Sequence, residues 1–334
     1  MRIAFCTGVS TFFLLALVGL TRAEDKLVMK LGHVLSPESH FHLTALEFAK
    51  LVKQKTDGKL EVQVFAQSQL GGEVQMTQAL RTGTQEMMIS GQSAIENTIK
   101  EWEIFDVPFM FSSVEDANAV LQGPAGKKFL DMMPTANIVG LTWLSAVERD
   151  LFTVKKPLTS LSDMKDLKVR VLQSPGYIST YKALGANPTP LAYSQLFLAL
   201  SQGLVDGADT SPDQFVQDKF IDVAKYFHLT HITYIPIVLA ISKSAWGKLT
   251  PGMQKSVQEA AHDAAQFDMK EYRRQYDAAL TLISKRGIEV RKVDTKPWVA
   301  AAEAARADFV ASVPSGKVLY AEILAARQTN PSNK

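Results

Sequence analysis

Strand-like and helix-like segments alternate twice along this chain, and this alternation constrains the fold more than any other feature. The first set has predicted strands at 27–31, 60–65 and 86–90 and predicted helices at 40–56 and 72–81. The second set has strands near Val169 and Thr189, helices at 175–184 and 194–201, and a strand end at 205–207. Strand–helix–strand units favour parallel sheets wrapped by helices. Two such sets predict an α/β protein with two lobes, and a ligand cleft beyond the carboxyl ends of the strands.

A single helical periodicity runs from Pro251 to about Lys285. A helix of this length extends roughly 50 Å, which is enough to lie across both lobes. We expect lobe I to comprise residues 24–147 and 236–270, and lobe II to comprise residues 148–235 and 271–334. The segments 145–149 and 232–237 are the predicted hinge between them.

The N-terminal segment has the pattern of a cleavable signal peptide over residues 1–23. Arg2 precedes an apolar run over 3–20, and Thr21-Arg22-Ala23 provides small residues at the cleavage site. A membrane anchor is the alternative, since the run approaches the length that crosses a bilayer. Polar residues within the run, at Thr7 and Ser10, favour cleavage. We therefore expect export to the periplasm.

The composition of the mature chain excludes several classes of function. Its only cysteine, Cys6, lies in the signal segment, so disulfides, iron–sulfur clusters and thiol chemistry are not expected. Without the two arginines of that segment, 34 basic residues face 34 acidic ones. A neutral chain does not attract nucleic acid or acidic membranes through its net charge. No second apolar run is long enough to span a bilayer, so we expect a soluble mature protein.

One arginine interrupts a strand that should pack. In the segment 168–172, Arg170 shares a face with Lys168 and Leu172. Its planar guanidinium pairs best with a carboxylate or phosphate through two parallel hydrogen bonds. The partner is either an acid of this chain, such as Asp166 or Glu148, or a ligand, and the spacing alone leaves both open.

Signals for catalysis or metal binding are weak. The only close histidine pairs are His40 with His42 and His228 with His231, and no acidic or cysteine partner is seen to complete either. The serine-hydrolase, dinucleotide-binding and P-loop patterns are absent. We expect no enzyme activity, no metal and no cofactor.

Several motifs occur in order along the mature chain. They are Leu31-Gly32-His33, Ser68-Gln69-Leu70-Gly71, and the segments 106–111, 165–170, 184–190 and 199–207. With them the chain resembles the substrate-binding proteins of tripartite ATP-independent periplasmic (TRAP) transporters, of the dicarboxylate type, over nearly its whole mature length. The resemblance implies the two-lobed α/β fold of type II-like periplasmic binding proteins, with a mixed sheet flanked by helices in each lobe.

The implied function is that of a monomeric, non-enzymatic carrier. It would close around a small organic acid and deliver it to permease subunits in the membrane. A periplasmic sensor that presents the acid to a signalling receptor is an alternative with the same cleft. An enzyme that acts on a carboxylated substrate is a third hypothesis.

The resemblance also implies roles for basic and polar residues of the second lobe. Arg170 would form a bidentate salt bridge with the ligand carboxylate, and Arg149 would add a second basic contact. For Arg149 the alternative is a solvated surface pair with its neighbours Glu148 and Asp150. Thr210 stands where an asparagine commonly touches the carboxylate, and Asp209 is shorter than the usual glutamate.

Four further residues complete the predicted site. Tyr193 would pack over the ligand, although aromatic residues at strand ends are usually core. Glu73 and Gln92 would contact the distal end of the ligand, although Glu73 is also a favourable first-turn helix charge. His33 could line the cleft or pack in the core. These groups suit a sugar acid or a small hydroxy- or dicarboxylate, whereas an aromatic acid would require Trp102, Trp143 or Phe105 to face the cleft.

Overall fold

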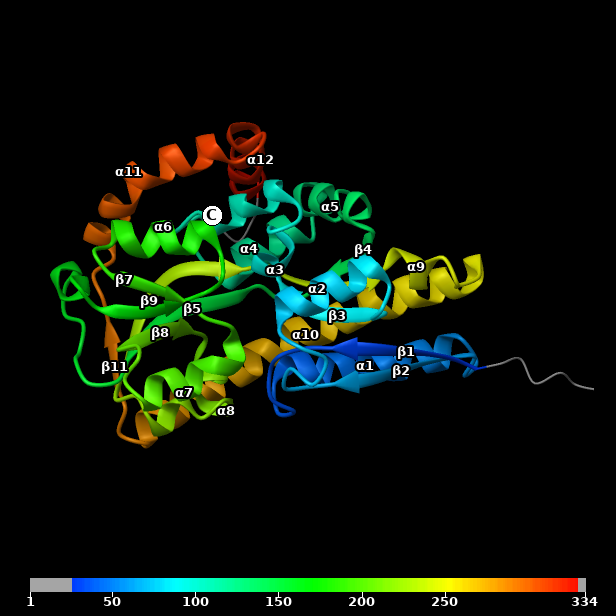
Figure 1. Ribbon diagram of the computed structural model, residues 1–334, viewed down its shortest axis with the longest axis horizontal. Helices are drawn as coiled ribbons and strands as arrows, with labels where there is room; N and C mark the ends of the chain where they lie inside the picture. Colours follow the sequence, from blue (N-terminus) through cyan, green and yellow to red (C-terminus); the bar gives the residue numbers. More distant parts are fainter. Residues whose placement is uncertain (1–25, 330–334) are drawn as a thin grey trace, which may run out of the picture.

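The computed structural model describes residues 26–329, and its strands form two separate sheets (Figure 1). The signal peptide predicted over 1–23 lies outside the described residues. The first sheet has the order β2-β1-β3-β10-β4. Its strands are β1 (Leu27–Gly32), β2 (Leu60–Phe65), β3 (Met87–Gly91), β4 (Ile138–Trp143) and β10 (Ile237–Ser242). β1 pairs in parallel with β2 and β3, which confirms the predicted first set, and β10 is antiparallel to β3 and β4.

The second sheet has the order β11-β9-β5-β8-β6-β7. Its strands are β5 (Val147–Thr153), β6 (Lys168–Val171), β7 (Asn187–Pro190), β8 (Gly207–Thr210), β9 (Tyr226–Ile235) and β11 (Glu289–Lys292). β6 is parallel to β7 and β8, whereas β5 is antiparallel to β8 and β9. Both sheets are therefore mixed, as the expected fold class requires.

Helices cover both sheets (Figure 1). From the first half of the chain they are α1 (His40–Lys55), α2 (Glu73–Thr82), α3 (Gln92–Ile95), η1 (Lys100–Asp106), α4 (Val114–Leu121), α5 (Pro124–Leu130), η2 (Met133–Ala136) and η3 (Leu161–Met164). The others are α6 (Pro175–Ala183), η4 (Tyr193–Gln195), α7 (Leu196–Ser201), α8 (Pro212–Gln217), η5 (Phe220–Asp222), α9 (Lys243–Trp246), α10 (Pro251–Lys285), α11 (Lys296–Ser312) and α12 (Gly316–Gln328). Side-chain caps fix several starts: Ser39, Ser174 and Thr250 accept backbone N–H bonds at α1, α6 and α10.

The chain crosses between the sheets twice through short connections, and a third time through α10, which joins β10 to β11. It leaves the first sheet after Trp143, enters the second at Val147, and returns through Pro236 between β9 and β10. Because β5 pairs with β9, with Val147 opposite Ile235, the two crossings lie side by side. They fall in the predicted hinge segments, and the hinge itself stays a prediction. We propose that each sheet is the centre of one lobe.

The 35-residue helix α10 has the predicted bounds and contacts both sets of elements. It packs against α1 and β4 on one side of the molecule and against α8 and β11 on the other (Figure 1). One buried acid of this helix, Asp268, joins three elements. Thr44 Oγ1 donates to it at 2.7 Å, the backbone N–H of Ser145 at 2.7 Å, and His40 Nδ1 lies 2.9 Å from it.

The C-terminal helices reach back over the first half of the chain. α11 packs against α6, and α12 packs against α4, α5 and η1. Since α5 also contacts β4, we propose that α12 belongs with the first lobe, whereas the sequence placed it in the second. Within the described residues no single helix is long and apolar enough to cross a membrane. One pair, Ala305–Ser312 and Gly316–Gln328, bent by 114°, would qualify by length and composition if taken together.

The aromatic residues that could have served an aromatic ligand lie in the core instead. Trp102, Phe105 and Trp143 are at most 2% exposed, and their ring centroids lie 4.9–6.2 Å apart. Phe129 joins the same cluster, 4.4 Å from Phe105. None of these rings lines a cavity of the cleft described below.

Asp268→Ala should lower the free energy of unfolding by about 3 kcal/mol, because it leaves three buried donors without an acceptor. The matched control on the same helix is Asp263→Ala. Asp263 is half exposed and lies 3.1 Å from Lys55, so its removal should cost less than about 1 kcal/mol. Urea unfolding of both variants measures the difference, and equal losses would contradict the role of Asp268.

His228 should make the protein sensitive to acid. Burial, and then the charge of Arg291, lower the pKa of His228 from 6.5 to about 4. The unfolded chain therefore binds a proton first, so this stability is present above pH 6.5 and is lost as the pH falls towards 4. From pH 7 to pH 5 the loss is roughly 2 kcal/mol. His228→Gln should flatten this dependence in urea titrations, whereas the exposed control His262→Gln should leave it unchanged.

Candidate functional site

The cleft between the sheets holds two small cavities that share a wall. Glu73, Ser93, Leu172 and Tyr193 line both of them. One cavity, of about 20 Å³, reaches Arg170, and the other, of about 40 Å³, reaches Arg149. The structure thus brings together side chains from both sets of elements. Each cavity has room for no more than a few waters. A larger and more open pocket of about 510 Å³ adjoins the Arg170 cavity and shares Val34, Ser68, Tyr193 and Ser194 with it.

Arg170 projects from β6 and is 1% exposed. Its Nε and Nη2 donate to the carbonyl oxygen of Leu191 at 3.0 and 2.8 Å, and its Nη1 is buried with no partner within residues 26–329. The guanidinium carbon lies 5.7 Å from the ring centroid of Tyr193, in cation–π range. Among the described residues it forms no ion pair, so the predicted alternative of a salt bridge with Asp166 or Glu148 is wrong.

The charge of Arg170 is poorly compensated. Burial, and next the repulsion of Arg149, lower the pKa of Arg170 to about 10. A guanidinium with this pKa still carries its charge at neutral pH. The site therefore holds a buried cation whose Nη1 hydrogens have no acceptor among the described residues.

Arg149, by contrast, is paired. It projects from β5, is 3% exposed, and its Nη2 donates to Asp209 Oδ1 at 2.9 Å and to the carbonyl oxygen of Asp209. β8 places Asp209 opposite Leu151 in the sheet, beside Arg149. Burial lowers the pKa of Arg149, but Asp209 raises it above its ordinary value overall. The predicted surface pair with Glu148 or Asp150 is wrong, because Arg149 is buried and faces Asp209.

Thr210 and Tyr193 are both held by other side chains. The hydroxyl of Thr210 donates to Gln214 Oε1 at 2.9 Å. The hydroxyl of Tyr193 donates to Asp218 Oδ2 at 2.6 Å, where burial raises the pKa of Asp218 to about 6. The Tyr193 ring packs edge-on against Phe220, at 5.9 Å between centroids, so it contacts the core and the cavities at once.

The predicted first-lobe residues separate into two groups. Glu73, in the first turn of α2, lines both cavities and accepts from Ser90 Oγ at 3.1 Å and Gly91 N at 3.2 Å. Gln92 and His33 are fully buried and line neither cavity.

The side chains of Gln92 and His33 instead contact residues that line neither cavity. Gln92 Nε2 donates to Asp106 Oδ1 at 2.7 Å, and His33 Nε2 lies 3.1 Å from His42 Nδ1. Burial, followed by the neighbouring His42 and His40, lowers the pKa of His33 to about 3. His33 is thus a neutral histidine of the core.

Sequence reasoning missed several residues that line the cavities. They are Val34, Leu172, Gln173, Ser93, Ser194 and Gln214. Val34, Leu172 and Gln173 lie in loops just after strands, and Ser93 and Ser194 lie in helices of three or four residues, where no periodicity marks them. Gln214 had a usable signal, because Pro212 starts a helix directly after β8 and places the first turn at the carboxyl end of that strand.

His228 and His231, the second predicted histidine pair, contact different residues. His228 Nε2 lies 3.2 Å from Thr153 Oγ1, whereas His231 Nδ1 lies 2.7 Å from Glu148 Oε1 and 3.5 Å from Asp150 Oδ1. The expectation that no acid accompanies either histidine pair is therefore wrong for His231, and it is also wrong for His40, whose Nδ1 lies 2.9 Å from Asp268 Oδ1. The two acids beside His231 are about eighty residues away in the sequence and reach it only through the pairing of β5 with β9.

Comparison with known proteins finds relatives along most of the chain. A solute-binding protein of Verminephrobacter eiseniae is 32% identical over 246 residues, which cover 74% of this chain and 73% of that protein. A TRAP periplasmic solute-binding protein of Polaromonas, with bound D-erythronate, is 31% identical with a TM-score of 0.86, and the match covers 91% of this chain and 99% of that one. A sugar acid binding protein of Advenella mimigardefordensis, in complex with galactonate, is 28% identical with a TM-score of 0.86, covering 91% and 98%.

The family description "Bacterial extracellular solute-binding protein, family 7" matches residues 31–312, which include nearly all strands of both sheets and both arginines of the cleft. The chain therefore belongs to this family, the DctP family of TRAP-transporter solute-binding proteins.

Proposed function

We propose that this protein binds a sugar acid in the cleft through a salt bridge to Arg170 and delivers it to the permease subunits of a TRAP transporter. The observation that carries the proposal is the buried guanidinium of Arg170, whose Nη1 has no partner. A buried cation of this kind is costly unless an anion accompanies it. A ligand carboxylate supplies that anion.

The orientation of the guanidinium supports two-point binding. Leu191 accepts from Nε and Nη2, which occupies one edge of the planar group. The other edge, formed by Nη1 and the second Nη2 hydrogen, stays available for two parallel hydrogen bonds to a carboxylate. Leu191 thus positions the group before the ligand arrives.

The charges around the cleft favour an acid with one carboxylate. Asp209 neutralises Arg149, so Arg170 is the cation left for the ligand. Glu73 lines both cavities and brings a negative charge to the facing side. A second carboxylate at the distal end of the ligand would face Glu73 and be repelled, whereas a hydroxyl would donate to it. Galactonate and D-erythronate, the ligands of two similar proteins, each carry one carboxylate and several hydroxyls.

Binding requires the lobes to separate and close again. Cavities of about 20 and 40 Å³ are too small for an organic acid to enter without rearrangement. The two adjacent crossings, at 144–146 and Pro236, are the places where the chain can bend with least disruption of the sheets. Helix α10 contacts both lobes and limits the motion to a small angle. The ligand biases the equilibrium by binding the closed form more tightly.

Transport with no turnover of the acid is the role that the family match supports over a sensor or an enzyme, and we propose that the protein acts as a monomer. A sensor would have the same cleft but a receptor as its partner. An enzyme would release a changed acid, so recovery of the unaltered ligand from denatured protein distinguishes it from a carrier.

Arg170→Ala should weaken the binding of D-galactonate about 100-fold or more, because the carboxylate loses its only uncompensated cation. Arg170→Lys should also bind weakly, since the planar fork is lost. Lys168→Ala, an exposed position on the same strand, is the matched control and should bind like the wild type. Isothermal titration calorimetry measures all four proteins, with circular dichroism to verify folding.

Unchanged affinity in the folded Arg170→Ala protein would exclude the proposed clamp. In cells, a carrier predicts that this variant also abolishes uptake of the acid. Normal uptake together with a lost transcriptional response would instead identify a sensor.

Glu73 should select against dicarboxylates. Galactonate and galactarate differ only in the oxidation of the distal carbon, so wild-type protein should bind galactonate at least about 10-fold more tightly. Glu73→Gln removes the repulsion and keeps an acceptor oxygen, so it should narrow this preference. Competition measurements test both statements. A wild-type protein that prefers galactarate, or a preference that Glu73→Gln leaves unchanged, would contradict this role for Glu73.

A further inference from the structure

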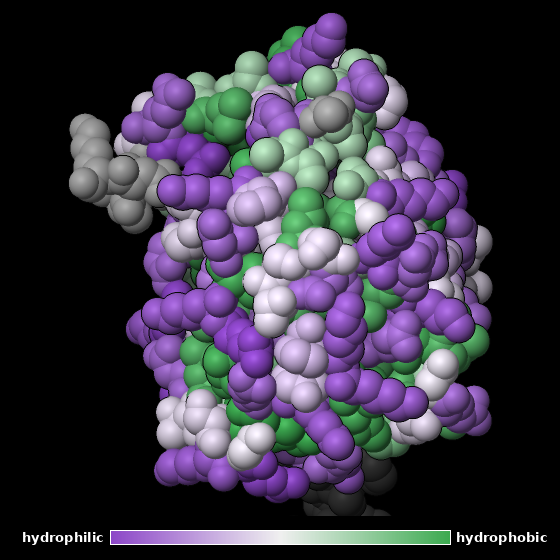
Figure 2. All heavy atoms as spheres, turned by 90° about the vertical axis from the view of Figure 1, so that its left-hand side faces the viewer, coloured by the Kyte–Doolittle hydropathy of each residue, from purple (hydrophilic) through white to green (hydrophobic). Residues whose placement is uncertain are grey.

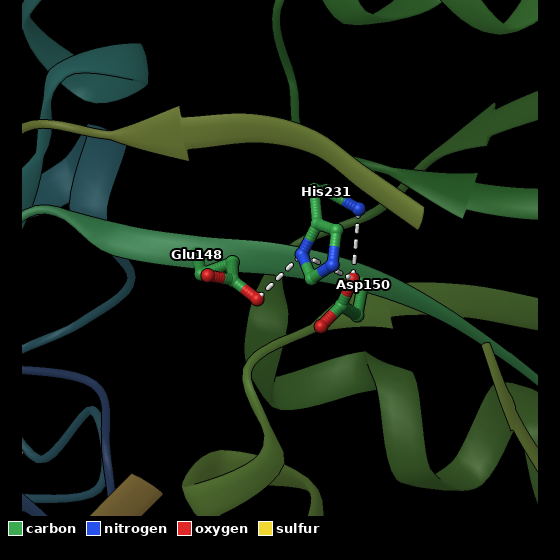
Figure 3. Close-up of side chains that lie close together, drawn as sticks. All are labelled: Glu148, Asp150 and His231. Atoms are coloured by element: carbon green, nitrogen blue, oxygen red, sulfur yellow. Dashed lines mark hydrogen bonds and ion pairs between the residues drawn. The ribbon is translucent and has the colours of Figure 1, made fainter. Parts of the chain in front are cut away.

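Three side chains that the ligand site does not use meet beside the crossing of the chain between the sheets. Glu148 and Asp150 come from β5 and His231 from β9 (Figure 3). Each offers one ligand atom, and these three atoms lie within 4.8 Å of one another. None of the three residues lines a cavity of the cleft.

The strand geometry explains why this cluster is separate from the ligand site. Successive side chains of β5 point to opposite faces, so Arg149 turns towards the cleft while its two neighbours turn away from it. The pairing of β5 with β9 shifts register between Arg149 and Leu151. Such a shift in register changes the direction of the side chains next to it. Here it brings the His231 side chain close to the carboxyl groups of Glu148 and Asp150.

Asp150 provides an independent sign that something is missing from the cluster. It is fully buried, and its Oδ1 accepts from the backbone N–H groups of Thr230 at 2.7 Å and His231 at 2.8 Å. Its Oδ2 is buried and accepts no hydrogen bond from a donor among the described residues, while the Asp150 carboxyl lies within hydrogen-bonding range of the Glu148 carboxyl. Two adjacent carboxylates need a shared proton or a cation between them. Figure 3 shows Asp150 Oδ2 turned to the side where the Glu148 carboxylate lies. An unpaired buried carboxylate oxygen is costly, and a cation would satisfy it.

The cluster is also held in place from outside. The hydroxyl of Tyr276, on α10, donates to Glu148 Oε1 at 2.7 Å. The two backbone amides fix Asp150 in the same way. Partners of this kind orient the ligands of metal sites in proteins. The His231 side chain is 44% exposed, which leaves a route from solvent to the two acids.

We propose that Glu148, Asp150 and His231 form a binding site for a divalent transition metal ion of the zinc class. One imidazole nitrogen and two carboxylates are a donor set that Zn²⁺ accepts, with a fourth position left to water. Donors bound tetrahedrally at 2.0–2.1 Å lie about 3.3 Å apart. The distance from His231 Nδ1 to Glu148 Oε1 is 2.7 Å and that to Asp150 Oδ1 is 3.5 Å, so the two distances bracket that value.

The site would connect the two strands that carry the chain between the sheets. Glu148 and Asp150 belong to β5 and His231 to β9, so an ion would cross-link these strands near both crossings. Because the unfolded chain lacks this arrangement, the ion would bind only the folded protein and raise its melting temperature.

The test is a Zn²⁺ titration of tag-free mature protein in competition with a chromophoric chelator. The wild type should bind one equivalent. His231→Ala and Asp150→Asn should weaken binding about 100-fold or more, and the asparagine keeps an acceptor for the two backbone N–H groups. His42→Ala, which removes one member of the other close histidine contact, should bind like the wild type. Co²⁺ should give a visible absorption band that His231→Ala abolishes.

The proposal is overturned if the wild type binds no Zn²⁺, which would mean that the two acids and His231 are balanced by protons alone. It is also overturned if His231→Ala keeps wild-type affinity, or if only His42→Ala loses it. Ca²⁺ that displaces Zn²⁺ at equal concentration would rule out the transition-metal class. His231→Ala remains informative if Asp150→Asn fails to fold, because His231 is the exposed member of the cluster.

Discussion

A buried arginine without an acidic partner is the constraint on which the rest of this site depends. Arg170 is held by a carbonyl oxygen and an aromatic ring, neither of which carries the opposite charge. Burying a cation in this way costs stability, so the surrounding fold must hold it rigidly. Strand β6 does so from the middle of the second sheet, between β8 and β7. Asp209 neutralises Arg149 and so limits the repulsion between the two arginines. In the complex that we propose, the ligand carboxylate supplies the negative charge that Arg170 lacks.

Strand β5 links this arrangement to the motion that binding requires. One face of β5 carries Arg149 towards the cleft, and the other carries Glu148 and Asp150 towards His231. The strand begins at Val147, directly after the first crossing, where Asp268 of α10 accepts from the backbone of Ser145. Any change in the angle between the sheets therefore bends the chain within a few residues of both polar groups. The proposed ligand site and the predicted hinge are thus connected through one short strand.

Local patterns were sufficient to predict most elements and to single out Arg170 as a charge on an apolar strand. The parallel β1–β3 set, the bounds of α10 and the exceptional position of Arg170 follow from periodicity and from one charge on an apolar strand. Features that join distant segments could not be predicted in this way. Strand β10 enters the first sheet from beyond residue 236, and Asp209 meets Arg149 across sixty positions. For the same reason the acids near His231 were missed. Gln92 and His33 were expected at the cleft, although Gln92 is hydrogen-bonded to Asp106 and His33 contacts His42, both outside the two cavities.

The position of Thr210 shows how such a departure from the family pattern is accommodated. Where the resemblance implies an asparagine, this chain has a hydroxyl that donates to Gln214 rather than lining a cavity. Gln214 is four residues further on, in the first turn of α8, and it lines the same cavity as Arg149. Its Oε1 accepts from Thr210, so its amide nitrogen is the part left to donate on this side of the cleft. In this chain the amide is thus supplied by the helix that follows the strand. Since the longer side chain starts from a different backbone position, it approaches a ligand from another direction, and the choice among sugar acids need not match that of any relative.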